Sequence, residues 1–86
     1  MLDTRKQTRR WLKLAPLSQY TLITTEAKLT PKEKDTLDKS ILYDYSQQKI
    51  ALENHEDISC VKRLIRHTYD KIHLALSSNF KDPFNP

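Results

Sequence analysis

Four side chains that donate hydrogen bonds lie close together between positions 59 and 66. Residues three or four apart share one face of an α-helix, and the apolar residues of this stretch repeat at that interval on the opposite face. The donor face carries Ser59, Lys62, Arg63 and Arg66, and the apolar face carries Val61, Leu64, Ile65, Thr68, Tyr69, Ile72 and Leu76. Such a donor face can bind a polyanion. The alternative is that it only keeps the helix in contact with water.

Residues that could support catalysis or bind a metal are few, namely His55, Cys60, His67 and His73. Cys60 is the single cysteine and lacks the paired cysteines of a zinc site, while His67 and His73 are six residues apart, on different sides of a helix. The chain has no glycine, so it cannot form a glycine-rich phosphate loop. We therefore expect no enzymatic activity, no metal site and no cofactor.

The positive charge of the chain is concentrated in two blocks. The 86 residues carry a net charge of +4. Residues 1–14 contain five Lys or Arg and one acid, residues 58–76 contain four and one, and residues 31–57 contain four Lys and seven acids. Clustered positive charge is typical of polyanion-binding proteins. The first block could extend a DNA-binding surface or bind RNA, with Trp11 as a stacking platform, unless Trp11 belongs to the core.

The length fits one small domain. Because glycine most easily adopts positive φ, its absence disfavours strand hairpins, and we expect an all-α fold, a small bundle of four to five helices connected through Pro, Asn and Asp. Capping residues and apolar spacing predict helices over 4–14, 17–29, 31–43, 46–54 and from 58 onward. The second is the weakest, because its middle, YTLITT, also fits a strand. The third has the best start, with Thr30 as cap, Pro31 in the first turn and Glu33 completing a capping box.

Residues 77–86 contain two Pro, two Asn and two Phe, so we expect an irregular tail in which Phe80 and Phe84 either move freely or pack on the body. A core this small would gain from a second copy, which makes a homodimer a further expectation. No apolar run approaches the 18 or so residues that span a membrane. The single cysteine and the N-terminus without an apolar signal segment predict a cytoplasmic protein.

The helix over 46–54, a short connection and the longer basic helix follow the order of a helix-turn-helix. Ala51 is small enough for the helix crossing, with Ile50 beside it in the core. The motifs LTPKE, YSQQKIA, VKR and KIHLAL, with Asp57 as a cap, resemble the fourth region of bacterial sigma factors and the sigma-like regulators of phages and mobile elements. The resemblance covers residues 29–76, preceded by a basic helical segment over 1–28, and the ten-residue separation of Ala51 from Val61 matches the family.

The resemblance implies sequence-specific binding to double-stranded DNA, transcription regulation and contact with RNA polymerase. The positions that match the family's base and backbone contacts are Ile58, Ser59, Lys62, Arg63 and Arg66, with Gln47 and Lys49 on the preceding helix. In this scheme Arg63 or Lys62 donates to guanine, and Arg66 holds phosphate. Ser59 could form a hydrogen bond with either a base or a phosphate.

One departure from the family pattern concerns the turn between the two helices. Asn54 and Glu56 stand where the family has apolar residues, and His55 stands where glycine often makes the turn. We therefore expect a longer turn or looser packing. The alternative function is that of a small phage-type helical protein that binds and modulates a host protein, with its basic helix against an acidic surface.

Overall fold

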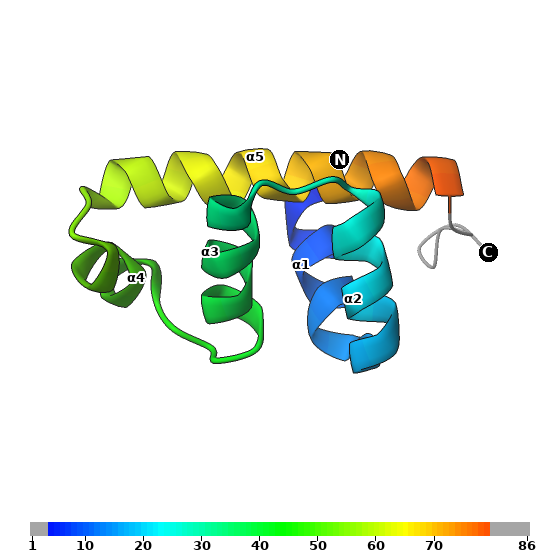
Figure 1. Ribbon diagram of the computed structural model, residues 1–86, viewed down its shortest axis with the longest axis horizontal. Coiled ribbons are helices and arrows are strands. Elements are labelled where there is room, and N and C mark those ends of the chain that lie inside the picture. The colour runs from blue at the N-terminus through cyan, green and yellow to red at the C-terminus, as the bar shows by residue number, and fades with distance from the viewer. Residues whose placement is uncertain (1–3, 80–86) are drawn as a thin grey trace.

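The computed structural model describes residues 4–79, which form five helices and contain no strand. The helices are α1 (Thr4–Leu14), α2 (Leu17–Glu26), α3 (Pro31–Ile41), α4 (Gln47–Asn54) and α5 (Ile58–Asn79). Figure 1 shows α5 running the length of the molecule, with the four shorter helices along one side of it. Each of the four packs against α5. The all-α prediction is confirmed.

The long helix α5 supplies one wall of the hydrophobic core. Its buried apolar side chains recur three or four residues apart and are at most 6% exposed: Val61, Ile65, Tyr69, Ile72, Ala75 and Leu76. The other helices contribute Leu12, Tyr20, Ile23, Leu37, Ile41, Ile50 and Ala51. Burial of each large apolar side chain contributes about 1.5–3 kcal/mol. One amphipathic helix thus serves as the packing partner of all the others.

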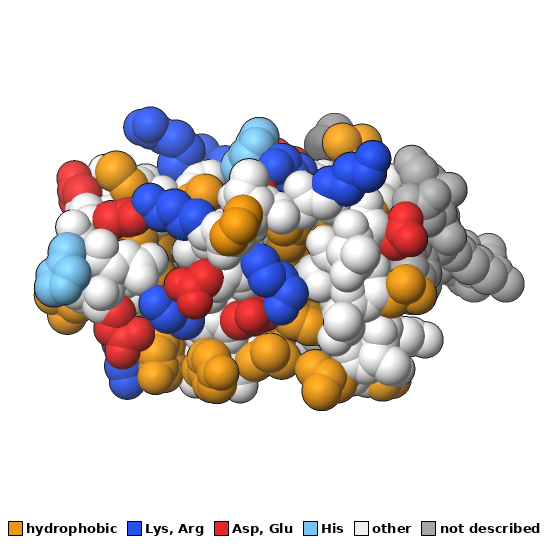
Figure 2. Space-filling model, viewed as in Figure 1, with side chains coloured by type: hydrophobic (Ala, Val, Ile, Leu, Met, Phe, Trp, Pro, Cys, Tyr) orange, Lys and Arg blue, Asp and Glu red, His pale blue; other side chains and the backbone are white. Residues whose placement is uncertain are grey.

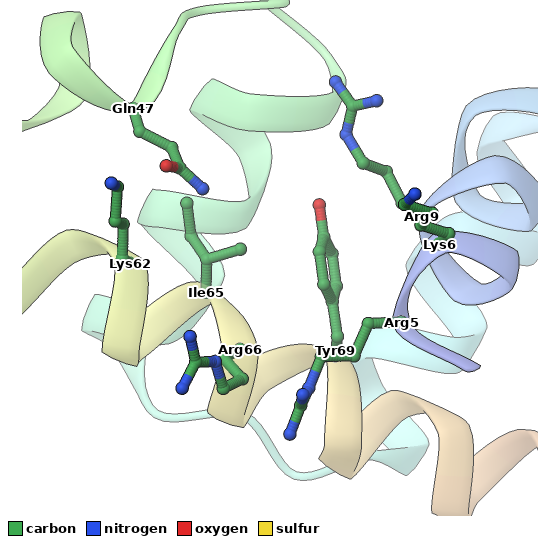
Figure 3. Close-up of a pocket in the computed structure, with 8 residues that line it drawn as sticks. All are labelled: Arg5, Lys6, Arg9, Gln47, Lys62, Ile65, Arg66 and Tyr69. Carbon is green, nitrogen blue, oxygen red and sulfur yellow. The ribbon is translucent and has the colours of Figure 1, made fainter. Parts of the chain in front are cut away.

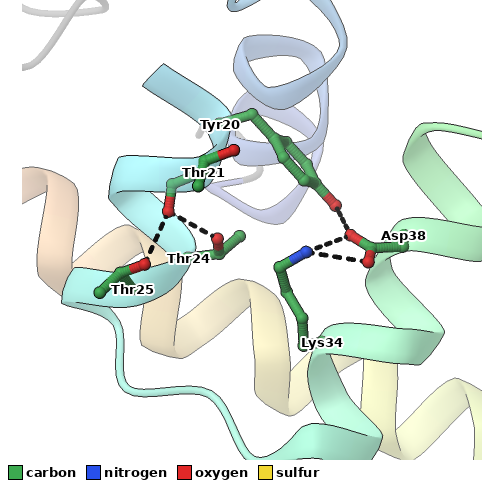
Figure 4. Close-up of polar contacts among 6 residues, drawn as sticks. All are labelled: Tyr20, Thr21, Thr24, Thr25, Lys34 and Asp38. Carbon is green, nitrogen blue, oxygen red and sulfur yellow. Dashed lines mark hydrogen bonds and ion pairs between the residues drawn. The ribbon is translucent and has the colours of Figure 1, made fainter. Parts of the chain in front are cut away.

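The threonine-rich segment forms α2, as the helical interpretation predicted. Tyr20 and Ile23 are buried in the core, which satisfies the apolar spacing of a helix. The hydroxyls of Thr24 and Thr25 each donate to the carbonyl of Thr21 at 2.9 Å (Figure 4). Threonine side chains that bond within their own helix in this way need no strand partner.

A polar cluster joins α2 to α3. The Tyr20 hydroxyl donates to Oδ1 of Asp38 at 2.7 Å, and Lys34 Nζ donates to both oxygens of the same carboxylate at 2.7 and 2.8 Å (Figure 4). Burial and the hydrogen bond to Asp38 raise the pKa of the Tyr20 phenol well above its ordinary value. The phenol therefore remains protonated and acts as a donor at neutral pH.

Within residues 4–79, three non-glycine residues adopt the left-handed conformation after helix ends. Lys28, Asp44 and His55 have φ of 54°, 56° and 55°. His55 closes α4, and the following N–H, that of Glu56, donates to the carbonyl of Ala51 at 2.9 Å. A left-handed non-glycine residue costs roughly 1–2 kcal/mol. The connections therefore use Lys and His in addition to the expected Asp. The link between α4 and α5 has three residues, so of the two alternatives, a longer turn or looser packing, the longer turn is not found.

Two helices are shorter than predicted and one is longer. α2 ends before the predicted residue 29, and α3 ends before residue 43. The prediction of an irregular segment over 77–86 is wrong for residues 77–79, which belong to α5. Proline is the strongest helix breaker, and the first proline of this segment is Pro83, so nothing in 77–79 ends the helix. Phe80 and Phe84 lie outside the described residues.

Glu33 connects the start of α3 to the middle of α5. Its Oε1 accepts the N–H of Thr30 at 2.8 Å and Lys71 Nζ at 2.7 Å, and its own N–H donates to the Thr30 hydroxyl at 3.2 Å. The residue is 2% exposed. Burial by itself raises the pKa of Glu33. The hydrogen bonds from Lys71 and Thr30 lower this pKa by a larger amount, so it lies below its ordinary value. The capping box predicted at Thr30 and Glu33 is confirmed.

None of the helices in the described part of the chain has the length and apolar character needed to cross a membrane.

Lys71→Met should lower the free energy of unfolding by about 1–3 kcal/mol at pH 7, because it leaves the buried Glu33 carboxylate without its cation. Folding lowers the pKa of Glu33, so its contribution is complete above the unfolded-state pKa and is lost as pH falls through the folded-state pKa. The difference in free energy of unfolding between Lys71→Met and the unaltered protein should therefore become smaller as the pH falls. Urea unfolding at pH 7 and pH 3 measures it, with Lys28→Met as the exposed control. A difference that does not change with pH would contradict this role of Glu33.

Ala51→Leu should overpack the crossing of α4 and α5 and cost about 1–3 kcal/mol, because Ala51 is only 5% exposed. Gln48→Leu adds the same side chain to an exposed position of α4 and should change stability by less than about 0.5 kcal/mol. Thermal unfolding followed by circular dichroism measures both. Equal melting temperatures for the two variants would show that the crossing tolerates a large side chain.

Candidate nucleic-acid interface

An open groove of about 220 Å³ lies between α1, α5 and the first turn of α4. Figure 3 shows α5 along one side of it and α1 and α4 at its two ends. The lining side chains are Arg5, Lys6 and Arg9 from α1, Gln47 from α4, and Lys62, Ile65, Arg66 and Tyr69 from α5. Five of the eight are cationic. The groove thus brings together the two basic blocks of the sequence.

The contribution of α1 follows from its helical spacing. Arg5 and Arg9 are one turn apart, with Lys6 beside Arg5, and all three are exposed. Thr8 and Leu12, on the adjoining face of α1, are buried against the rest of the protein. Because those residues fix the rotation of the helix about its axis, the three cations must face outward beside α5.

The contribution of α5 follows the same rule. Lys62 and Arg66 are one turn apart and exposed, and they flank Ile65 and Tyr69, which are only 4% and 6% exposed. In Figure 3 the hydroxyl of Tyr69 points away from the α5 backbone, into the space between α1 and Ile65. The groove thus has a largely apolar floor and a cationic rim, which suits a ligand with an anionic backbone.

One acidic residue beside the groove offsets part of this charge. Arg5 Nε and Nη2 donate to the two carboxylate oxygens of Asp70, each at 3.2 Å. Both side chains are about half exposed, so the pair contributes little stability. Among the described residues, no carboxylate lies within ion-pair distance of Lys6, Lys62 or Arg66. The groove therefore retains a net positive charge.

The cationic surface continues along α1 into a second hollow, lined by Lys6, Arg9, Arg10, Lys13 and Leu14. The two hollows share Lys6 and Arg9. Lys13 Nζ lies 3.0 Å from Asp44 Oδ1, and its hydrogen bond and charge, with a smaller contribution from Arg9, lower the pKa of Asp44. We call the combined surface the basic strip, which consists of Arg5, Lys6, Arg9, Arg10, Lys13, Lys62 and Arg66.

Of the seven DNA-contact residues predicted from the sequence, Gln47, Lys62 and Arg66 line the groove. Ile58, Ser59 and Arg63 are exposed on the first two turns of α5, outside the groove but on the same helix. The seventh, Lys49, lies with Nζ 4.0 Å from the ring centroid of Tyr45, an arrangement typical of a cation–π contact. Three of the seven residues are therefore brought together, and four are not.

The start of α5 is acidic, which bears on how it could meet DNA. Glu56 forms an ion pair with Lys32, and the carboxylate of Asp57 accepts a hydrogen bond from the Ser59 hydroxyl at 3.1 Å. A phosphate at the very N-terminus of α5 would meet the Asp57 charge. Phosphate is better accommodated one turn later, at Lys62 and in the groove.

Sequence reasoning offered the first basic block only as a possible extension of the DNA-binding surface, and it did not identify Arg5, Lys6 and Arg9 as neighbours of Lys62 and Arg66. Their spacing on α1 was a usable signal that they share an exposed face. The spacing carries no information on which helix lies beside that face. Trp11, in contrast, is half-buried and packs against the core, which favours its interpretation as a core residue over that of a stacking platform.

Comparisons of the chain with protein-family models, curated proteins and solved structures gave no match. The resemblance to the fourth region of sigma factors therefore remains a prediction from the residues. Within residues 4–79, no three His, Cys, Asp or Glu side chains are grouped closely enough to hold a metal ion.

Proposed function

We propose that this protein is a sequence-specific, DNA-binding transcription regulator of the sigma-like helix-turn-helix type. The observation that carries the proposal is the convergence of cations from α1 and α5 on one groove. Residues that are more than fifty positions apart in the sequence contribute to it, so it is a property of the fold. Concentrated positive charge attracts the DNA backbone and supplies most of the affinity that does not depend on sequence.

In the proposed complex, the groove binds phosphates. Lys6, Arg9, Lys62 and Arg66 are exposed and can donate to phosphate oxygens, and the Gln47 amide can add a neutral hydrogen bond. Arg5 is held by Asp70 at the rim and would exchange that carboxylate for phosphate. Binding phosphate would relieve the repulsion among these like charges.

The first two turns of α5 would enter the major groove and read bases. Arg63 is exposed and directly follows Lys62 in α5, and Ser59 lies one helical turn before Arg63. An arginine in this place can donate two hydrogen bonds to guanine O6 and N7. If the resemblance holds, RNA polymerase is a second expected partner. If DNA binding fails, the same cations would suit an acidic surface of a host protein.

The phosphate contacts are tested by neutralising one groove cation at a time. Arg9→Gln and Arg66→Gln should each weaken binding to every duplex alike and reduce the slope of log K against log salt concentration by about one unit. Fluorescence anisotropy with a random duplex, at several salt concentrations, measures both quantities.

The matched control is Lys28→Gln, which removes an exposed positive charge that does not line the groove. Its salt slope should equal that of the unaltered protein. If all three variants bind as the unaltered protein does, or if the unaltered protein shows no salt-dependent binding, the groove does not bind DNA.

Base reading is tested at Arg63. Selection from a random duplex pool would first define a preferred site. Arg63→Ala should then cost about 1–3 kcal/mol on that site and remove the preference at one base pair. Arg66→Ala should instead weaken preferred and scrambled duplexes equally. A uniform loss for Arg63→Ala as well would assign it to phosphate and leave base reading to other residues.

A further inference from the structure

Large apolar side chains are exposed at the edge of the molecule that lies away from α5. Leu14, Leu17, Leu42 and Tyr43 are 75%, 65%, 47% and 64% exposed. Figure 2 shows hydrophobic side chains gathered along the lower edge, where the ends of α1, α2 and α3 meet in Figure 1. We call these four residues the apolar edge.

The apolar edge is assembled from two distant parts of the chain. Leu14 and Leu17 flank the α1–α2 connection, and Leu42 and Tyr43 follow α3. The ion pair between Lys13 and Asp44, with Nζ 3.0 Å from Oδ1, holds the two parts together. Leu14 comes two residues after the buried Leu12, so it lies on the other side of α1 and remains exposed.

We propose that the apolar edge binds the same edge of a second copy of this chain in a two-fold dimer. In a two-fold contact, if residue i of one copy faces residue j of the other, then j also faces i. Lys13 of each copy would therefore face Asp44 of the other. The pair of Lys13 and Asp44 at this edge is therefore complementary to the same pair in a second copy. Asp44 is well placed for this exchange, because its side chain is 77% exposed.

The area of the edge is of the right order for a small interface. Exposed side chains of this size contribute on the order of 100 Å² each, so four supply roughly half of the ~800 Å² that a stable dimer buries per partner. Their surroundings would supply the rest. A chain of 86 residues buries a modest fraction of its surface when it folds alone, so the added burial would also stabilise the fold.

Dimerisation goes beyond the proposed DNA binding and does not depend on it. Leu14 and Lys13 also line the second hollow of the basic strip, so a two-fold contact here would bring the strips of both copies near each other. The experiments contain no nucleic acid, and their outcome is therefore separate from that of the DNA titrations.

The first experiment measures mass by sedimentation equilibrium from about 10 µM to about 1 mM. The mass of the unaltered chain should rise from 10.2 kDa toward twice that value. Leu14→Ser combined with Tyr43→Ser should weaken dimerisation at least tenfold. Leu74→Ser, which alters an equally exposed leucine on α5, should leave it unchanged. Circular dichroism checks that each variant is folded.

The second experiment identifies the partner as another copy in the proposed register. Lys13→Asp and Asp44→Lys each place like charges opposite one another in a dimer of identical variants, so each alone should be monomeric. An equimolar mixture should dimerise, because every facing pair then joins one lysine to one aspartate. An unaltered chain that stays monomeric over the whole range would overturn the proposal, and so would a mixture that gains no mass over the separate variants.

Discussion

The buried carboxylate of Glu33 makes both a local contact, at the start of α3, and a long-range contact with α5. Along the chain it completes the capping box that starts α3, and across the chain it accepts a hydrogen bond from Lys71 on α5. A buried charge is tolerated only when such partners satisfy it. This contact joins α3 to α5, the helix that packs against all four others.

Polar contacts also join α4 and the turn after it to α3. Lys39 Nζ donates to the Asn54 side chain at 2.9 Å, and Lys32 pairs with Glu56. Asn54 and Glu56 are the positions at which the sigma-like pattern has apolar residues. Here Asn54 joins the end of α4 to α3 through a hydrogen bond, and Glu56 joins the following turn to α3 through an ion pair. Ala51 remains buried. The departure from the pattern thus changes the kind of contact and does not lengthen the turn.

Local signals were enough to predict most of the helices. The hydroxyls of Thr30 and Ser46 each accept the N–H of the residue three positions later, and a cap of this kind depends only on nearby sequence. Helix ends were less predictable, since Lys28 takes a left-handed conformation that its residue type disfavours. The prediction ends α5 too early because the composition of residues 77–86 suggests irregular structure, although residues 77–79 contain no proline or glycine.

The groove and the apolar edge could not be predicted, for a physical reason they share. Periodicity shows which face of a helix is apolar or charged, but the neighbour of that face depends on contacts between distant segments. Leu14 lies on the side of α1 away from the buried Leu12, and this spacing does not show that Leu42 and Tyr43 lie at the same edge. Arg9 and Arg66 belong to different basic blocks and become neighbours only because α1 packs beside α5.

The charges of α3 and those of Lys62 and Arg66 on the basic strip are arranged differently. On α3, lysines alternate with acids one turn away, as in Lys34 with Asp38 and Lys39 with Asp35, and Figure 2 shows basic and acidic side chains interleaved on that face. On the strip, Lys62 and Arg66 have no carboxylate within ion-pair distance in the part of the chain that the structure describes. A fold that neutralises its charges in one place and gathers like charges in another bears a repulsion that an external anion would remove. That asymmetry, more than the net charge, is the physical basis for proposing a polyanion as the ligand.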